Sequence, residues 1–150
     1  MISLKLIDGV IPSEVKLLAK WRRQVQSIWH ETFKVTYSGT KKWTLNLIKD
    51  KKRMLFFVVK NNEFIGHIGF DRIGGNFVYI GNVVRGRGRK DGSMSAAMKF
   101  LISLSQKMGK DCYVRVLNFN KNAIRFYKRL GFKVSKNLGK NLKMKYEDNT

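Results

Sequence analysis

The chain has 150 residues, of which 43% are hydrophobic and only one is proline, so it can bury a core and does not have the composition of a disordered tail. Its lone cysteine, Cys112, excludes an internal disulfide, and no apolar run approaches the length of a membrane span. The 31 Lys and Arg residues outnumber the 10 Asp and Glu residues, and the resulting net charge of +21 favours polyanionic or phosphorylated partners.

The first half of the chain predicts a strand, helical segments and an antiparallel meander. Loose alternation over residues 2–7 predicts the strand, and Ser13 is placed to cap a helix that runs to about Gln26. Residues 28–48 are helical in places, without a clear period. Three short strands joined by tight turns of asparagine and glycine follow, at residues 54–60, 64–73 and 77–84.

The second half of the chain alternates between helices and strands. A loop rich in arginine and glycine, residues 85–92, leads into a helix whose apolar residues recur every three or four positions and which ends at Gly109 as its C-cap. A strand, a helix stopped by Gly131 and one or two further strands are predicted at residues 112–117, 120–130, 132–134 and 142–146. This order predicts a mixed α/β sheet in one domain, residues 1–150. With no signal peptide visible at the start, we expect a cytoplasmic protein, and we expect neither a metal site nor a membrane partner.

The loop before the first of these two helices has the features of an anion site. Glycine lets backbone N–H groups approach an anion, and the helix that begins near Ser93 directs unpaired amides and the positive end of its dipole at the loop. Cationic side chains add charge-assisted donors: Arg85, Arg87, Arg89 and Lys90. The loop lacks the spacings of a P-loop and of a dinucleotide fingerprint. It predicts phosphate or pyrophosphate binding, with a solvated basic loop or a nucleic-acid contact as the alternatives.

Two motifs resemble those of the GCN5-related N-acetyltransferases (GNAT), an acetyl-CoA-dependent family. Residues 89–94 resemble its Q/R-x-x-G-x-G/A signature at Arg89 and Gly92, whereas Met94 stands where the family has glycine or alanine. Residues 118–132 resemble its N-x-x-A-x-x-x-Y-x-x-x-G-F signature at every defined position, which are Asn120, Ala123, Tyr127, Gly131 and Phe132. The resemblance extends over more than half of the chain.

This resemblance implies a fold and a cofactor site. Members of the family have a bent mixed sheet with an antiparallel N-terminal meander, splayed fourth and fifth strands, and helices on both faces. The pantetheine arm of acetyl-CoA is then expected in the gap between the splayed strands, with its pyrophosphate on the loop. The residues assigned to acetyl-CoA in this way are Asn82, Val83, Val84, Arg87, Gly88, Arg89, Lys90, Asp91, Gly92, Ser93, Asn118, Asn120 and Tyr127.

Tyr127 is implied to be the acid that protonates the departing thiolate, and Asn120 to lie near the pantetheine. Helical spacing places both residues on one face, which fits these roles. The alternatives are a core tyrosine and a simple helix cap; we favour the acid for Tyr127 and accept both roles for Asn120. A backbone N–H near Val84 is the oxyanion donor that the resemblance implies.

The base that deprotonates the amine stays open at this point. An alkyl ammonium group needs a base or a chain of waters to become a nucleophile. Water-mediated transfer is as good an expectation as any of the titratable side chains near the expected site, which are His30, Glu31, Glu63, His67 and Asp71.

The acceptor is expected to be a small anionic molecule that carries a primary amine. The family usually binds its acceptor between the first helices and the meander, which selects Trp21, Arg22, Trp29 and His67, with core packing as the alternative for the tryptophans. Residues 18–23 and 82–86 resemble the subgroup that acts on nucleotide-linked amino sugars. The expected function is therefore direct transfer of an acetyl group from acetyl-CoA to such an amine, with a homodimer left open.

A nucleic-acid partner is the alternative. Coenzyme A accounts for the arginines of the loop, but the last third of the chain also carries many cations with few acids to balance them. The acceptor would then be a nucleic acid or an aminoacyl-tRNA, or the chain would be a basic nucleic-acid-binding module without catalytic activity.

Overall fold

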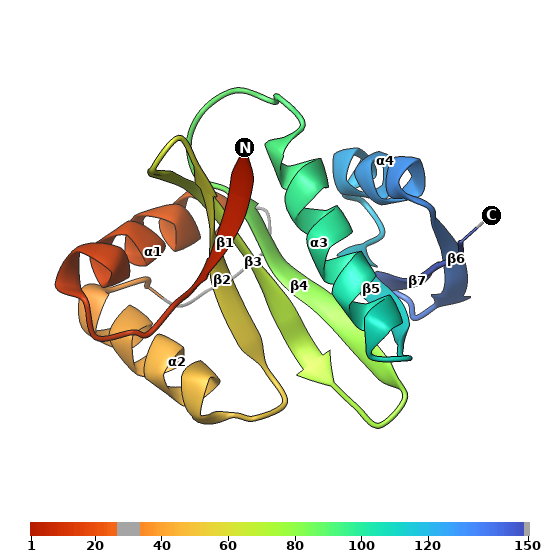
Figure 1. The fold of residues 1–150 in the computed structure, drawn as a ribbon, viewed down its shortest axis with the longest axis horizontal. Helices are drawn as coiled ribbons and strands as arrows, with labels where there is room; N and C mark the ends of the chain where they lie inside the picture. Colours follow the sequence, from red (N-terminus) through yellow and green to blue (C-terminus); the bar gives the residue numbers. More distant parts are fainter. Residues whose placement is uncertain (27–33, 149–150) are drawn as a thin grey trace.

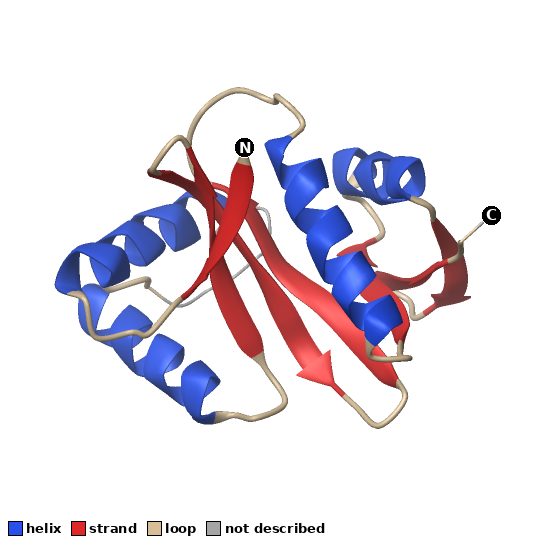
Figure 2. Cartoon of the chain, viewed as in Figure 1, coloured by secondary structure: helices blue, strands red, loops and turns tan. Residues whose placement is uncertain are grey.

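In the computed structural model, which describes residues 1–26 and 34–148, helices lie on both faces of a mixed sheet (Figures 1 and 2). The elements in chain order are β1 (Ile2–Leu6), α1 (Pro12–Val25), α2 (Tyr37–Lys49), β2 (Met54–Lys60), β3 (Glu63–Ile73), β4 (Phe77–Arg85), α3 (Ser93–Lys107), β5 (Asp111–Leu117), α4 (Lys121–Leu130), β6 (Phe132–Asn137) and β7 (Asn141–Tyr146). The predicted mixed α/β sheet is confirmed.

The seven strands lie in the order β1-β2-β3-β4-β5-β7-β6. Strands β2 to β4 form the predicted antiparallel meander, β1 pairs antiparallel with β2, and β5 joins β4 as a parallel neighbour after the crossover through α3. Strand β7 pairs antiparallel with both β5 and β6. The sheet therefore has one parallel junction among its described strands, between β4 and β5.

Turn chemistry explains several of the element boundaries. Asn61 and Asn62 have φ angles of 51° and 62°, which asparagine tolerates better than most residues, and they close the β2–β3 hairpin. Gly131 ends α4 with a φ of 109°, as predicted. The C-cap of α3 is Met108, not the predicted Gly109, which follows it in the left-handed region with a φ of 68°.

The predicted cap of the first helix is wrong. Ser13 lies inside the first turn of α1, and the N-cap is Ile11, which makes no side-chain capping bond. Pro12 explains the earlier start, because its fixed φ suits the first helical position and its missing N–H costs nothing there.

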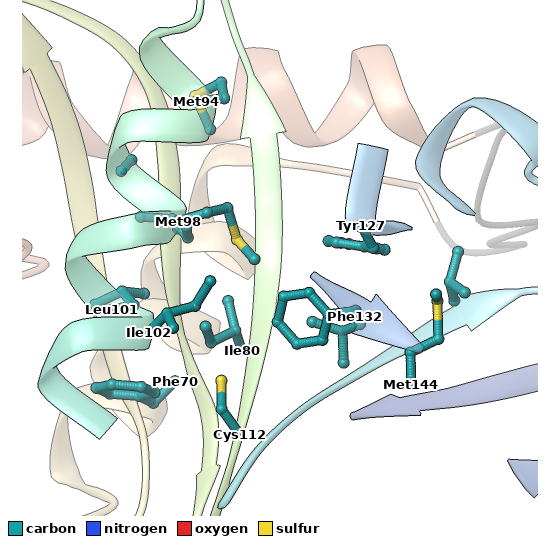
Figure 3. Packing of buried hydrophobic residues seen from close by; sticks show 14 of the residues in the cluster. Phe70, Ile80, Met94, Met98, Leu101, Ile102, Cys112, Tyr127, Phe132 and Met144 are labelled. Carbon is teal, nitrogen blue, oxygen red and sulfur yellow. The ribbon is translucent and has the colours of Figure 1, made fainter. Parts of the chain in front are cut away.

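Two buried clusters lie against the sheet. The larger contains the inward faces of α3 and α4, including Met98 and Tyr127, packed on alternate residues of β4, β5 and β7 (Figure 3). The smaller contains Leu18, Trp21 and Leu47 of α1 and α2, packed on β2 and on the end of β4. Within the described residues, no helix is long and apolar enough to cross a bilayer.

Candidate active site

Strands β4 and β5 separate part of the way along their length. They pair from Phe77 with Asp111 to Ile80 with Val114, and no pairing continues from there towards Arg85. A strand that leaves its partner exposes backbone N–H and C=O groups that need another partner. The gap between β4 and β5 is therefore a place where a ligand can complete the hydrogen bonds of a strand.

A bulge in β4 marks the start of this gap. His67 of β3 pairs with Val84 and Gly69 pairs with Gly81, so two residues of β4 stand opposite one residue of β3. Asn82, one of these two, has a φ of 54°. The bulge bends β4 at two of the positions that the family resemblance assigns to the pantetheine, Asn82 and Val83.

His67 is buried beneath the bulge. Its Nδ1 lies 2.5 Å from the carbonyl oxygen of Asn82, and because a carbonyl only accepts, Nδ1 carries the proton and donates. Burial lowers the pKa of His67 to about 4; the hydrogen bond to Asn82 opposes this shift and the charge of Arg22 adds to it. The ring is therefore neutral at pH 7, and its Nε2 has no hydrogen-bond partner among the described residues.

A groove of about 930 Å³ occupies the gap and continues over the face of the sheet. Among the expected site residues, Asn82 and Val83 of β4 and Asn120 and Tyr127 of α4 line it. Its other lining residues come mainly from β3, β4, β5 and β7: Asp71, Arg72, Asn76, Phe77, Tyr79, Ile80, Gly81, Asp111, Tyr113, Arg115, Val116, Leu117, Ala123, Asn141 and Lys143.

Asn120 and Tyr127 reach the groove from the same helix. The side chain of Asn120 caps α4 by accepting a hydrogen bond of 3.2 Å from the backbone N–H of Ala123. Tyr127 is 8% exposed and packs edge-on against Phe132 at 5.8 Å (Figure 3). Burial raises the pKa of Tyr127 to about 12, so its hydroxyl keeps its proton at neutral pH and can donate it.

The arginine- and glycine-rich loop is anchored at its start and leads into α3 at its end. At its start, the N–H groups of Gly86 and Arg87 donate to the carbonyl of Ile65, and the backbone of Gly86 lies against Trp21 so closely that a Cβ there would be 1.9 Å from the indole. At its end, Gly92 is the N-cap of α3 with a φ of 85° and nothing near its missing side chain.

Asp91 places a carboxylate at the start of α3. Its Oδ1 accepts from the N–H of Ser93 at 2.9 Å and pairs with Arg85 at 3.0 Å, while its Oδ2 accepts from Lys60. The hydrogen bonds from Lys60, Ser93 and Arg85 hold the pKa of Asp91 far below its usual range. The carboxylate thus neutralises part of the positive potential at the helix N-terminus. The side chains of Arg87, Arg89 and Lys90 in the loop are exposed, so they can contact a second anion.

The expected acceptor residues are not brought together in the groove. Trp21 is 1% exposed and packs on Phe57 and His67, so its place is in the core. Arg22 joins α1 to α2 through Thr40 and lies over the ring of Trp43. Trp29 lies outside the described residues, as do His30 and Glu31 among the candidate bases.

Two further expected residues take defined places. Asn118 donates from Nδ2 to the carbonyl of Gly139 at 2.6 Å, which fixes the β6–β7 turn, and it is not among the residues that line the groove. Of the described candidate bases, Asp71 lines the groove and pairs with Arg53 at 2.9 Å, whereas Glu63 lies exposed at the start of β3.

The sequence reasoning did not select the face of β4, β5 and β7 that continues the groove. Tyr79, Tyr113, Arg115 and Lys143 lie there, and we call these four residues the aromatic–cationic platform. A signal was present, because each of them alternates with buried residues on its strand. Which strands adjoin, and in which register, is information that the alternation alone does not carry.

Comparisons with known proteins agree with this geometry. The sequence model described as the acetyltransferase (GNAT) family matches residues 19–132. The structure of the Campylobacter jejuni N-acetyltransferase PseH in complex with acetyl coenzyme A is similar, with a TM-score of 0.78 and 17% identity over 99% of this chain and 100% of that chain. No curated protein matches by sequence.

Two other solved structures illustrate the range of similar proteins. The PaiA N-acetyltransferase from Thermoplasma acidophilum in complex with coenzyme A has a TM-score of 0.72 and 15% identity over 99% of each chain. An acetyl transferase from Salmonella typhimurium that modifies the N-terminal serine of ribosomal protein L7/L12 has a TM-score of 0.77 and 16% identity over 96% of this chain and 92% of that chain.

Proposed function

The chain belongs to the GNAT family of acetyltransferases, and we propose that it transfers an acetyl group from acetyl-CoA directly to the primary amine of a small anionic acceptor. The observation that carries this proposal is the gap between β4 and β5, because it places an unpaired strand backbone beside a buried tyrosine, and β4 leads from the gap into the loop that precedes α3. The similar structures that hold acetyl coenzyme A or coenzyme A support the choice of donor.

The residues present fit acetyl-CoA. The backbone of Asn82, Val83 and Val84 is free of a β5 partner and suits the amide-bearing pantetheine arm. The loop, residues 87–93, suits the pyrophosphate, because Gly88 and Gly92 adopt left-handed φ angles and leave their Cβ positions nearly or wholly open. When bound, acetyl-CoA supplies the electrophilic thioester carbonyl.

Tyr127 has the properties that an acid needs in this reaction. Its hydroxyl carries its proton at pH 7, well below the pKa that burial raises to about 12, and its side chain lines the groove together with Ala123 of the same helix and the N-cap Asn120. We assign it the proton that the leaving thiolate takes up, while the proton that the attacking amine loses passes to solvent water, from which Tyr127 regains its own. The backbone N–H near Val84, in the stretch of β4 that has no β5 partner, is assigned to the oxyanion.

The proposal of direct transfer is supported by the surroundings of Cys112. The thiol is 3% exposed in the α3 cluster and does not line the groove. Burial raises the pKa of Cys112 to about 11, with a smaller opposing effect from a hydrogen bond with Ser105. A buried neutral thiol cannot act as an acetyl carrier, so the amine itself attacks the thioester.

Charge supports an anionic acceptor. The net charge of +21 repels polyamines and other cationic amines. At the groove itself, Arg72, Arg115 and Lys143 contribute cations to the lining. A nucleotide-linked amino sugar meets these conditions, because it carries both a primary amine and phosphate groups.

A nucleic-acid or aminoacyl-tRNA acceptor is the second candidate. The exposed face of α4 carries cations outside the groove, which are Lys121, Arg125, Lys128 and Arg129. A chain that tracks phosphates loses affinity steeply as salt rises, whereas a chain that binds a buried cofactor loses little. The salt dependence of ligand binding therefore distinguishes a nucleic-acid acceptor, or a purely binding role, from acetyl transfer to a small anionic acceptor.

Thermal unfolding with acetyl-CoA tests the proposed function, with ADP and a short DNA as anionic controls. A ligand at 100 times its dissociation constant stabilises the fold by about 2.7 kcal/mol. We expect a rise in Tm specific to acetyl-CoA that persists at moderate salt, followed by release of free thiol when an anionic amine is added. Equal, salt-sensitive shifts with every polyanion would instead show a nucleic-acid binder.

A further inference from the structure

The aromatic–cationic platform lies on the sheet face opposite α3. On β4, Val78 and Ile80 are buried in the α3 cluster, so Tyr79 between them points to the other face. The same alternation holds on β5 and β7, where the buried residues that flank the platform are Cys112, Val114, Val116 and Met144. Four side chains from three strands therefore share one face.

Register brings these four side chains into contact. Tyr79 pairs with Tyr113 across the parallel junction, and their rings stack with centroids 5.4 Å apart. Arg115 pairs with Lys143 across β5 and β7. The guanidinium of Arg115 lies 4.8 Å from the centre of the Tyr79 ring, and the ammonium of Lys143 lies 4.4 Å from the centre of the Tyr113 ring.

The two platform cations are available for an anion. Among the described residues, neither Arg115 nor Lys143 forms an ion pair, whereas the nearby acids Asp71 and Asp111 pair with Arg53 and Lys145. The tyrosine rings hold the two cations by cation–π contact, which restricts their side-chain freedom before a ligand arrives. A ligand that binds them therefore loses less conformational entropy than it would with free surface lysines.

The platform and Tyr127 line the same groove. Along β4, Tyr79 and Val83 are four residues apart, which is about 13 Å at the rise of a strand. The volume of the groove, about 930 Å³, is within the range of small-molecule sites. A ligand with its phosphates on the platform can thus extend an amine into the gap beside Tyr127.

We propose that the aromatic–cationic platform binds the phosphate groups of a nucleotide-linked amine acceptor and so holds its amine at the gap between β4 and β5. This proposal rests on the proposed function, because it identifies where the anionic part of the acceptor lies. Arg115 offers paired N–H donors that match two phosphate oxygens, and Lys143 offers a point charge beside it. The acceptor enters from the face opposite α3, and the loop before α3 is left to the donor.

Binding of uridine 5′-diphosphate to the full chain saturated with coenzyme A tests the proposal, with uridine as the matched probe without phosphate. Coenzyme A is titrated first, by calorimetry, so that its site is filled and the proposed function is tested separately. We expect uridine 5′-diphosphate to bind the saturated protein and uridine to bind at least tenfold more weakly. If the chain binds coenzyme A but not uridine 5′-diphosphate, the proposal about the platform is overturned and the proposed function still stands.

Variants then locate the binding. Arg115→Gln and Lys143→Gln should each weaken the binding of uridine 5′-diphosphate about tenfold and leave the affinity for coenzyme A unchanged. Lys99→Gln, which removes one exposed cation from α3 on the other side of the sheet, is the control and should change neither affinity by more than about twofold. Arg115→Lys keeps the charge and loses the paired donors, so its affinity for uridine 5′-diphosphate should lie between those of the native chain and Arg115→Gln.

Two results would contradict the proposal. Equal effects of Lys99→Gln and Arg115→Gln would show that only the overall charge attracts the nucleotide. Binding of a single-stranded oligonucleotide that is tighter than that of uridine 5′-diphosphate and is lost in Arg115→Gln would assign the platform to nucleic acid. Unchanged Tm values for the variants confirm in each case that the fold is intact.

Discussion

The two ends of the proposed ligand site differ in their construction. The donor end is backbone: the unpaired stretch of β4 at the groove, and beyond the groove lining a glycine-containing loop and the start of α3. The acceptor end, on the sheet face opposite α3, is made of side chains, the aromatic–cationic platform, which three strands supply. A backbone site follows from local sequence, whereas a side-chain site depends on which strands are neighbours. We expect changes at one end to leave the ligand of the other end unaffected, and the following variants test that separation.

The largest effect is expected at the backbone end, from Gly92→Asp. It places a second carboxylate where the pyrophosphate should lie, next to Asp91, and acetyl-CoA binding should fall below detection by calorimetry. Gly109→Asp is the control, since Gly109 also has a positive φ and open space but follows the other end of α3. Tight binding of acetyl-CoA by Gly92→Asp would mean that the loop does not hold the pyrophosphate.

Tyr127→Phe should lower kcat about 100-fold with little change in the KM for acetyl-CoA, because it removes a proton donor and keeps the packed ring. Steady-state kinetics with an anionic amine measures both constants. Tyr146→Phe is the matched control, as that ring packs on Phe132 and does not line the groove. An unchanged kcat would remove Tyr127 from the role of acid.

His67 lies buried beneath the β4 bulge, outside the groove lining, and its effect should appear in stability. Its pKa is about 4 in the folded chain against 6.5 when unfolded, so the unfolded state binds the extra proton first as the pH falls. The free energy of unfolding should therefore drop by about 2 kcal/mol between pH 6.5 and pH 5 from this group. Urea unfolding at several pH values in that range measures the free energy of unfolding of the native chain and of His67→Gln. The plot of this free energy against pH should be less steep for the variant. Parallel plots would contradict a buried neutral ring.

The smallest effect is expected from Asp91→Asn, which keeps the acceptor for the N–H of Ser93 and removes the charge beside the anion site. The dissociation constant of acetyl-CoA should decrease roughly threefold at low salt, since a repelling carboxylate is lost. Asp50→Asn serves as the control, because Asp50 accepts from Lys52 in the same local geometry far from α3. Weaker binding of acetyl-CoA by Asp91→Asn would show that the carboxylate orders the loop and does not compete with the phosphates of acetyl-CoA for the helix N-terminus.

Features that depend on neighbouring residues were predicted better than features that depend on distant ones. The turn at Asn61 and the helix stop at Gly131 depend on residues adjacent in the chain, and both were predicted correctly. The cap at Ser13 was wrong because a proline one residue earlier set the start of α1. Trp21 was expected at the acceptor, yet the packing of α1 on β2 and β3 places it in the core.

The sequence by itself determined the order of elements, the arginine- and glycine-rich loop before α3 and the helix that carries Tyr127 with Asn120 as its cap, since each depends on glycine, helix ends or a spacing of three to four residues. Only the tertiary structure decided that His67 is neutral beneath the β4 bulge and that Tyr79 and Arg115 share a face with Lys143. These features depend on strand order, register and burial. Those are set by contacts between residues far apart in the chain, and no local pattern carries them.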